Sequence, residues 1–157
     1  MQSVAPIQLI RHRSGAPGLR LGLGPGLRPA GALAQLQGLL NRNSFWARGR
    51  SHAALATMLR GSAAAVSAWQ GQELVGFGRA SSDDLFRAVL WDVVVAAEHQ
   101  GCGLGRRIVA TLLEHPRLRK VERVYLMTSN SSGFYQHLGF EAVISQELML
   151  KQRHTTV

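Results

Sequence analysis

The chain has 157 residues, a length that suits one domain, and no stretch approaches the roughly 18 to 20 uninterrupted apolar residues of a membrane-spanning helix. The missing apolar stretch means that no membrane partner is expected. Its one cysteine, Cys102, excludes an internal disulfide, so a reduced, cytoplasmic setting is the default expectation. Lys and Arg number 18 against 9 for Asp and Glu, which gives a net charge of +9 that attracts anions.

The positive charge alone does not identify a partner. The basic residues are scattered from Arg11 to Arg153, and few aromatic residues lie among them to stack on bases, which disfavours a nucleic acid. A phosphate-bearing cofactor explains the charge at least as well, and so does an ordinary basic surface.

The first part of the chain predicts two helices after a loosely held start. Residues 1–18 lack the apolar core of a secretory signal, and a strand is predicted at residues 19–23. Leucines at i, i+3, i+6 and i+7 predict an amphipathic helix over residues 29–41. Ser51 resembles an N-cap and predicts a second helix that ends at Gly61.

Strands and a glycine-rich loop follow. Residues 64–69 and 74–80 flank a short Gly-containing connection and predict a hairpin, and a valine-rich strand is predicted at residues 87–95. Glycines at 101, 103 and 105 lead into a predicted helix over residues 104–114.

The last part predicts a strand at residues 123–128, a short helix at residues 132–137 and a final strand at residues 140–150. Parallel strands joined by a helix cross over with a right hand. The glycine loop is therefore expected at the carboxyl end of the central strand.

The glycine loop has the chemistry of an anion site. Glycines let the backbone approach a ligand closely, and the following helix presents unpaired N–H groups and a positive dipole end. Arg106 and Arg107 are disfavoured in a first helical turn, and an anionic ligand would remove that conflict. A Walker A loop is excluded because Gly-Lys-Ser/Thr is absent, and a dinucleotide fingerprint needs a small residue at Arg106.

Two motifs point to a family. Residues 90–95 (LWDVVV) and 98–105 (EHQGCGLG) resemble the central strand and Gln/Arg-x-x-Gly-x-Gly/Ala loop of the Gcn5-related N-acetyltransferases (GNAT). Residues 134–140 (FYQHLGF) resemble the Tyr-x-x-x-Gly-Phe signature of the same family. The resemblance spans residues 74–150, and its wording is closest to the cyanobacterial and plastid branch.

The resemblance implies an α/β (α+β) fold in one domain over residues 1–157. The family has a mixed sheet of six to seven strands with about four helices, and its splayed parallel central strands form the CoA slot. The implied enzyme uses acetyl-CoA as cosubstrate and acetylates an amine by direct attack. The acceptor would be a small arylalkylamine, or a lysine or N-terminal amine of a protein. Homodimers are common in such folds, although nothing in the sequence fixes an interface.

The family motifs also imply which residues contact the cofactor. Backbone groups of the central strand would bind the acetyl carbonyl and pantetheine, and the loop would hold the pyrophosphate. These positions are Val93, Val94, Val95, Gln100, Gly101, Cys102, Gly103, Leu104, Gly105 and Arg106. Relatives often carry Asn where this chain has Thr128, so Asn130 is either a cofactor contact or, with Ser131, a helix N-cap.

Two residues are candidates for proton transfer. Tyr135 stands at the family position of the phenol that gives a proton to the departing thiolate. Asp92 is the candidate general base, and its alternative is a structural acid held by Arg87 or another basic neighbour. His99 and Cys102 form an isolated pair, so no metal site is expected.

Other functions stay open at this point. A non-catalytic acetyl-CoA-binding regulatory module would keep the glycine loop without a working acceptor site. A basic nucleic-acid-binding protein would carry the loop incidentally. Phe45, Trp46 and Trp69 either line an acceptor pocket or pack in the core or on the surface.

Overall fold

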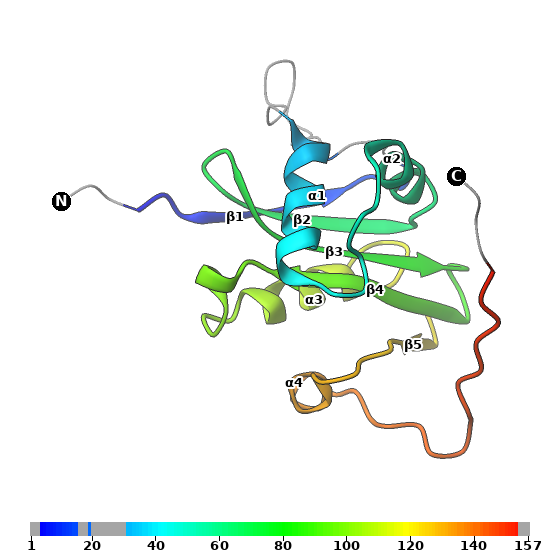
Figure 1. The fold of residues 1–157 in the computed structure, drawn as a ribbon. Helices are drawn as coiled ribbons and strands as arrows, with labels where there is room; N and C mark the ends of the chain where they lie inside the picture. Colours follow the sequence, from blue (N-terminus) through cyan, green and yellow to red (C-terminus); the bar gives the residue numbers. More distant parts are fainter. Residues whose placement is uncertain (1–3, 16–18, 20–30, 154–157) are drawn as a thin grey trace. The chain divides into compact units, whose positions relative to one another are not determined.

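The structure is a computed structural model that describes residues 4–15, 19 and 31–153. The chain comprises two compact units, residues 1–127 and residues 128–157. The expected strand at residues 19–23 lies outside the described residues except for Leu19, which is buried. The first unit contains β1 (Ile7–His12), α1 (Ala32–Asn43), α2 (His52–Arg60), β2 (Ala64–Gln70), β3 (Glu73–Ser82), β4 (Arg87–Val95), the 3₁₀ turn Ala97–His99, α3 (Leu104–Leu113) and β5 (Arg123–Tyr125) (Figure 1).

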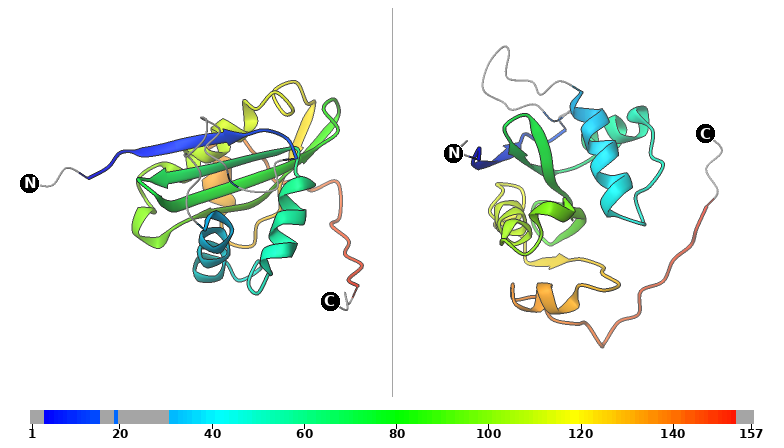
Figure 2. Two further views of the ribbon diagram at one scale, coloured as in Figure 1. Left: turned by 90° about the horizontal axis from the view of Figure 1, so that it is seen from above. Right: turned by 60° about the vertical axis from the view of Figure 1, so that its left-hand side comes forward.

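The first unit is an α/β layer structure around one mixed sheet. The strands lie in the order β1-β2-β3-β4-β5, with antiparallel pairing from β1 to β4 and a parallel β4–β5 pair. Helices α1 and α2 cover one face of the sheet and α3 covers the other (Figure 2). Buried side chains of β2 face both helical layers, so the core lies on both sides of this strand.

Local signals explain the helices of the first unit. Helix α1 buries Leu36, Leu39 and Leu40 on one face, as the leucine spacing predicts. Ser51 accepts a hydrogen bond from the backbone N–H of Ala54 at 3.1 Å, which confirms it as the N-cap of α2. Both predicted helices therefore form, with α1 displaced by a few residues towards the C-terminus.

Helix α3 packs directly against β3 at two residues that lack side chains, Gly76 and Gly78. A Cβ atom at Gly76 would lie 2.7 Å from Ile108 Cδ1, and one at Gly78 would lie 3.0 Å from both Ile108 Cγ2 and Leu112 Cδ1. Glycine at these two positions lets α3 settle directly on β3. This contact fixes where the amino end of α3 meets the carboxyl end of β4.

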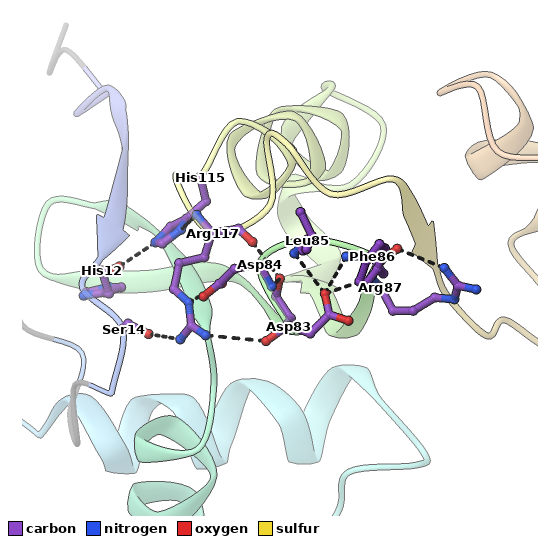
Figure 3. Close-up of polar contacts among 10 residues, drawn as sticks. His12, Ser14, Asp83, Asp84, Leu85, Phe86, Arg87, His115 and Arg117 are labelled. Atoms are coloured by element: carbon purple, nitrogen blue, oxygen red, sulfur yellow. Dashed lines mark hydrogen bonds and ion pairs between the residues drawn. The ribbon is translucent and has the colours of Figure 1, made fainter.

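A polar network fastens the opposite end of the sheet (Figure 3). Asp83 Oδ1 accepts hydrogen bonds from three consecutive backbone N–H groups, those of residues 85–87, at 2.7–3.0 Å. These bonds hold the pKa of the exposed Asp83 carboxyl below its ordinary value. Arg117 donates to Asp84 and to Ser14, both at 2.6 Å, and so connects the β3–β4 turn to the segment after β1.

The second unit contains α4 (Ser132–Gln136) and an irregular segment that follows it. The short helix expected near residues 132–137 is confirmed. The final strand expected at residues 140–150 is wrong, because these residues form no strand and apolar side chains such as Ile144 are almost fully exposed. Alternating apolar residues favour a strand only where a neighbouring strand supplies hydrogen-bond partners.

The strand count differs from the expected six to seven. Among the described residues the sheet has five strands. The sequence predicts a loosely held segment at residues 1–18 and no strand there. In the structure, β1 (Ile7–His12) pairs with β2 along its whole length. β5 covers three residues of the six expected. No helix in the described ranges is long and apolar enough to cross a bilayer.

Candidate cofactor-binding site

The carboxyl half of β4 has an unpaired edge. Strand β5 pairs with β4 only from Arg87 to Val89, opposite residues 123–125. Beyond Val89 no described strand continues this ladder, so β4 backbone groups from Leu90 to Val95 have no strand partner on that side. A strand edge of this kind can accept an extended, amide-containing ligand as if it were a further strand.

A bulge interrupts β4 within this same stretch. Phe77 pairs with Val94 and Arg79 pairs with Trp91, so that two β4 residues, Asp92 and Val93, stand opposite the single residue Gly78. Asp92 adopts a φ of 54°, in the left-handed region that non-glycine residues rarely enter. The bulge redirects the backbone of β4 immediately before the residues that the family motif assigns to the cofactor.

The three valines that follow Asp92 differ in burial. Val94 is buried, and Val93 and Val95 are half-buried. Gln100 donates a hydrogen bond from Nε2 to the backbone oxygen of Val95 at 3.1 Å. A ligand that donates to the Val95 carbonyl would therefore share this oxygen with Gln100 or displace its side chain, whereas one that accepts from backbone N–H groups does neither.

The glycine loop is open on its outer side. Gly101 and Gly103 have φ values of 79° and 84°, and a Cβ atom at either position would meet nothing within 4 Å. Both residues need the freedom of glycine for this turn. Cys102, exposed between them, donates its thiol hydrogen to the backbone oxygen of His99 at 2.8 Å.

The amino end of α3 has the features of an anion site. Gly103 is its N-cap and offers no side-chain cap, and the first turn contains no acidic residue. The first N–H groups of a helix have no partner within the helix, so those of Leu104, Gly105 and Arg106 are available to a ligand. Arg106 is exposed beside them, whereas the Leu104 side chain is buried and only its backbone is available.

Asp92 is buried within a cluster of donors. Its side chain is 4% exposed and accepts hydrogen bonds from Arg79, Arg50 and Trp46. Burial alone would raise the pKa of Asp92, but the hydrogen bonds from Arg50 and Arg79 outweigh it and hold this pKa below the ordinary value. The alternative of a structural acid held by Arg87 or another basic neighbour is met by Arg50 and Arg79, whereas Arg87 is exposed and donates to the backbone oxygen of Phe86.

Sequence reasoning missed the cluster around Asp92. Arg79 could have been found from the hairpin register, since it pairs with Trp91, the neighbour of Asp92. Arg50 and Trp46 come from the loop between α1 and α2, more than 40 positions away, and no local signal links them to β4.

Two aromatic residues project from that same loop. Phe45 and Trp46 pack edge to face with ring centroids 5.1 Å apart, and their exposed fractions are 64% and 48%. Trp69, in contrast, is buried in β2 and donates its indole N–H to Ser67 Oγ at 2.7 Å. Trp69 is therefore a core residue, and Phe45 and Trp46 form a surface pair.

Tyr135 and Asn130 lie in the second unit. The ring of Tyr135 packs edge to face against Phe134 and Phe140, and partial burial raises the pKa of its phenol. The side chain of Asn130 accepts a hydrogen bond from Ser131 Oγ at 3.2 Å. Ser131 occupies the N-cap position of α4, as one alternative for these two residues has it, but it makes no side-chain cap bond, and its N–H donates to Thr128 Oγ1.

Metal-binding side chains do not gather in the described part of the chain. No group of three or more His, Cys, Asp or Glu residues lies close enough there to hold an ion. His99 hydrogen-bonds Gln70 through Nε2 at 3.1 Å.

Curated relatives match a little under half of the chain. The chain is 43% identical over 74 residues to GCN5-related N-acetyltransferase 2, chloroplastic, from Arabidopsis thaliana, covering 46% of this chain and 29% of that protein. It is 40% identical over 68 residues to the uncharacterized N-acetyltransferase ycf52 of Gracilaria tenuistipitata var. liui, covering 43% and 37%. It is 43% identical over 67 residues to serotonin N-acetyltransferase 2, chloroplastic, of Oryza sativa subsp. japonica, covering 42% and 34%. The chain thus spans about a third of the length of these relatives.

Solved structures share the fold. A GNAT-family acetyltransferase structure from Xanthomonas campestris aligns with a TM-score of 0.70 at 24% identity and covers 95% of both chains. The aminoglycoside N-acetyltransferase AAC(6')-Iy, solved in complex with CoA, aligns with a TM-score of 0.68 at 14% identity and covers 99% of both. At these identities the likeness concerns the fold alone.

The family itself follows from the sequence match. Residues 33–140 match the model of the Acetyltransferase (GNAT) family, a span that covers most of the chain and reaches into both units. The chloroplastic and ycf52 relatives confirm the plastid-like branch. The chain is therefore a member of the GNAT acetyltransferase family, in its plastid-like branch.

Proposed function

We propose that this protein is an acetyl-CoA-dependent N-acetyltransferase that acetylates an amine by direct attack, and that residues 1–157 act as one catalytic domain. The observation that carries the proposal is the unpaired edge of β4 next to the open glycine loop and the uncapped start of α3. The edge suits the amides of pantetheine, and the loop suits a pyrophosphate. Family membership supports the same assignment.

Each part of the site has a proposed task. Backbone groups of residues 93–95 would bind the pantetheine arm and the acetyl oxygen, and residues 100–106 would hold the phosphates. Acetyl-CoA supplies an activated acetyl group as a thioester. The positive charge of the exposed Arg106 suits an anionic cofactor. Asn130 is proposed as a further polar contact, by its nearness in sequence to the family position at Thr128.

The proposed reaction also needs two proton transfers, one from the amine and one to the departing sulfur. An amine must be neutral to attack, and at pH 7 deprotonation of a lysine-like amine costs about 4.6 kcal/mol. Tyr135 is the proposed proton donor to the departing sulfur. A phenol of ordinary pKa, about 10, is already protonated at neutral pH, and burial raises the pKa of Tyr135 further, so the proton is present when the thiolate departs.

The acceptor is proposed by class only. An arylalkylamine fits the pair of exposed aromatic rings on the loop between α1 and α2, and one relative is named a serotonin N-acetyltransferase. A protein amine is the second candidate, since another relative is named a histone acetyltransferase.

Two measurements test the proposal in sequence. Acetyl-CoA at 100 times its dissociation constant should stabilise the protein by about 2.7 kcal/mol, which a thermal-shift assay detects. Thiol release is then measured with a panel of aromatic amines, lysine peptides and N-terminal peptides. Stabilisation without thiol release for any amine would indicate a non-catalytic acetyl-CoA-binding module. Absence of stabilisation, together with salt-sensitive binding to DNA or RNA, would indicate a nucleic-acid-binding protein.

A further inference from the structure

The Asp92 carboxylate joins three separate parts of the first unit. Oδ2 accepts from Arg79 Nε at 2.7 Å and from Arg50 Nη1 at 3.0 Å, and Oδ1 accepts from Trp46 Nε1 at 3.1 Å. Arg79 belongs to β3, whereas Arg50 and Trp46 belong to the loop at residues 44–51 between α1 and α2. One buried side chain therefore ties this loop to the bulge of β4.

The same contacts make Asp92 a poor proton acceptor. A general base needs a free lone pair within reach of the substrate and a pKa near the working pH. Both oxygens of Asp92 already accept charged or polar hydrogens, and the side chain is 4% exposed. The hydrogen bonds from the two arginines also stabilise its charged form. Three of the roughly four lone-pair sites of the carboxylate accept hydrogen bonds, and with the side chain 4% exposed an amine has little access to the remaining site on Oδ1.

The backbone at Asp92 shows what the contacts hold in place. A non-glycine residue with a φ of 54° is strained by about 1–2 kcal/mol, and such strain persists only where the surroundings over-determine it. Three hydrogen bonds to one carboxylate provide that constraint. The bulge at the start of residues 93–95 and the loop that carries Phe45 and Trp46 thus share one buried anchor, although Gln37 and Asn41 of α1 also hydrogen-bond this loop.

We propose that Asp92 is a positioning residue that fastens the loop at residues 44–51 to the β4 bulge, so that Phe45 and Trp46 form the contact surface for the body of the acceptor amine. This inference rests on the proposed function. The indole N–H of Trp46 is fixed by Asp92, while its ring stays 48% exposed and packs against Phe45. Such a fixed and exposed aromatic pair suits an acceptor with a flat, apolar body.

The test separates positioning from proton transfer by substitutions that each remove one of the contacts of Asp92 or its charge. Trp46→Phe keeps an aromatic ring but removes the N–H that reaches Asp92. Arg50→Gln removes one ion pair and leaves the Arg79 pair intact. Arg48→Gln is the matched control, because Arg48 lies on the same loop and donates only to the backbone oxygen of Ser44 in the described contacts. Asp92→Asn removes the charge and keeps the size.

Steady-state thiol release is measured for each variant with acetyl-CoA and the best acceptor of the wild type, from pH 6 to pH 9. We expect Trp46→Phe and Arg50→Gln to raise the acceptor KM about three- to tenfold and to leave the acetyl-CoA KM within about twofold, while Arg48→Gln matches the wild type. Asp92→Asn should raise the acceptor KM further and keep the acidic limb of the kcat/KM profile at the wild-type pH.

Three results would overturn the proposal. Loss of the acidic limb in Asp92→Asn, with a normal acceptor KM in Trp46→Phe and Arg50→Gln, would make Asp92 the base. Should Asp92→Asn fail to fold, an unchanged acceptor KM in the other two variants is decisive against positioning. A wild-type protein that releases no thiol overturns the proposed function and this inference with it, whereas an active wild type limits the failure to the positioning role.

Discussion

Arg79 Nε lies 2.7 Å from Asp92 Oδ2, an ion pair that bridges β3 and β4 at the point where their register shifts. Both partners are largely buried, with side-chain exposures of 18% and 4%. In the antiparallel ladder Arg79 pairs with Trp91, and its guanidinium also lies 5.9 Å from the centre of the Trp91 ring. The bulge is therefore held from the β3 side as well as from the loop between α1 and α2.

Removing Arg79 should destabilise the fold. Arg79→Gln leaves a buried carboxylate with one ionic partner fewer, and breaking a buried pair in this way costs about 3 kcal/mol. Urea unfolding measures the difference in free energy. Glu122→Gln is the control, because the Glu122–Arg123 pair is exposed on both sides and exposed pairs contribute under about 1 kcal/mol. Equal stability of the two variants would contradict the structural weight given to Arg79.

The elements that sequence reasoning predicts well are those with local signals. The valine-rich strand β4, the glycine loop and α3 follow from apolar spacing, glycine positions and a helix start within some 30 residues. What could not be predicted depends on distant partners. Arg50 and Trp46 reach Asp92 only through the tertiary fold, and β1 becomes a strand because β2 offers it an edge. Residues 140–150 form no strand despite their alternating apolar residues, because that local pattern does not by itself supply hydrogen-bond partners.

Substitution of Gly103 should weaken acetyl-CoA binding beyond the loss of stability that a side chain at this φ brings. Gly103→Ala strains a backbone with φ of 84° and places a methyl group on the open side of the loop, where the phosphates are proposed to bind. We expect the dissociation constant for acetyl-CoA, measured by calorimetry, to rise about tenfold or more.

Gly71 offers a matched control for that substitution. It has a φ of 61° and equally open surroundings, but it lies in the β2–β3 turn. Gly71→Ala should show a comparable loss of stability and an unchanged affinity for acetyl-CoA. If both variants bound acetyl-CoA as the wild type does, the glycine loop would not be the phosphate site.

Tyr135→Phe should lower kcat with little effect on acetyl-CoA affinity. The substitution keeps the ring that packs against Phe134 and Phe140 and removes only the phenol proton. General acid catalysis contributes about 100-fold or more, so a loss of that order is expected in thiol-release assays. Tyr125→Phe, on β5, changes the same atom at another position and serves as the control. A kcat equal to that of the wild type would exclude Tyr135 as the proton donor.

His115 should make stability depend on pH in the mildly acidic range. Its Nδ1 accepts the N–H of Arg117 at 3.1 Å and its Nε2 lies 3.2 Å from the backbone oxygen of His12, an arrangement that requires the neutral ring (Figure 3). Burial lowers the pKa of His115, and the nearby Arg11 and Arg117 act in the same direction.

The sign of this effect follows from the lowered pKa. The unfolded chain takes up the proton at a pH near 6.5, and the folded protein takes it up only at a lower pH. The stabilisation is thus complete above about pH 6.5 and is lost as the pH falls through the folded-state pKa. In urea unfolding from pH 8 to pH 4.5, His115→Gln should lose less stability than the wild type. Parallel curves for the two proteins would contradict the assignment.

A side chain at Gly78 should lower the free energy of unfolding, because α3 packs directly on this residue. A Cβ atom there would lie 3.0 Å from Ile108 Cγ2 and from Leu112 Cδ1, and 3.4 Å from Val93 Cγ2. Ile108 and Leu112 are fully buried, so neither can move without lifting α3 from the sheet. Overpacking of this kind costs about 1–3 kcal/mol, and we expect Gly78→Val to lie at the upper end of that range in urea unfolding.

Two further variants test whether the loss at Gly78 comes from contact with α3. Gly61→Ala is the control, since its Cβ would lie 3.6 Å from the nearest atom at an ordinary φ, and it should be neutral or stabilising by up to about 1 kcal/mol. Leu112→Ala removes one of the two atoms that the new side chain meets. The double variant Gly78→Val/Leu112→Ala should therefore be more stable than the sum of the single losses by about 0.5–3 kcal/mol. Strict additivity would mean that the cost at position 78 does not come from contact with Leu112 and arises elsewhere, for example within β3 itself.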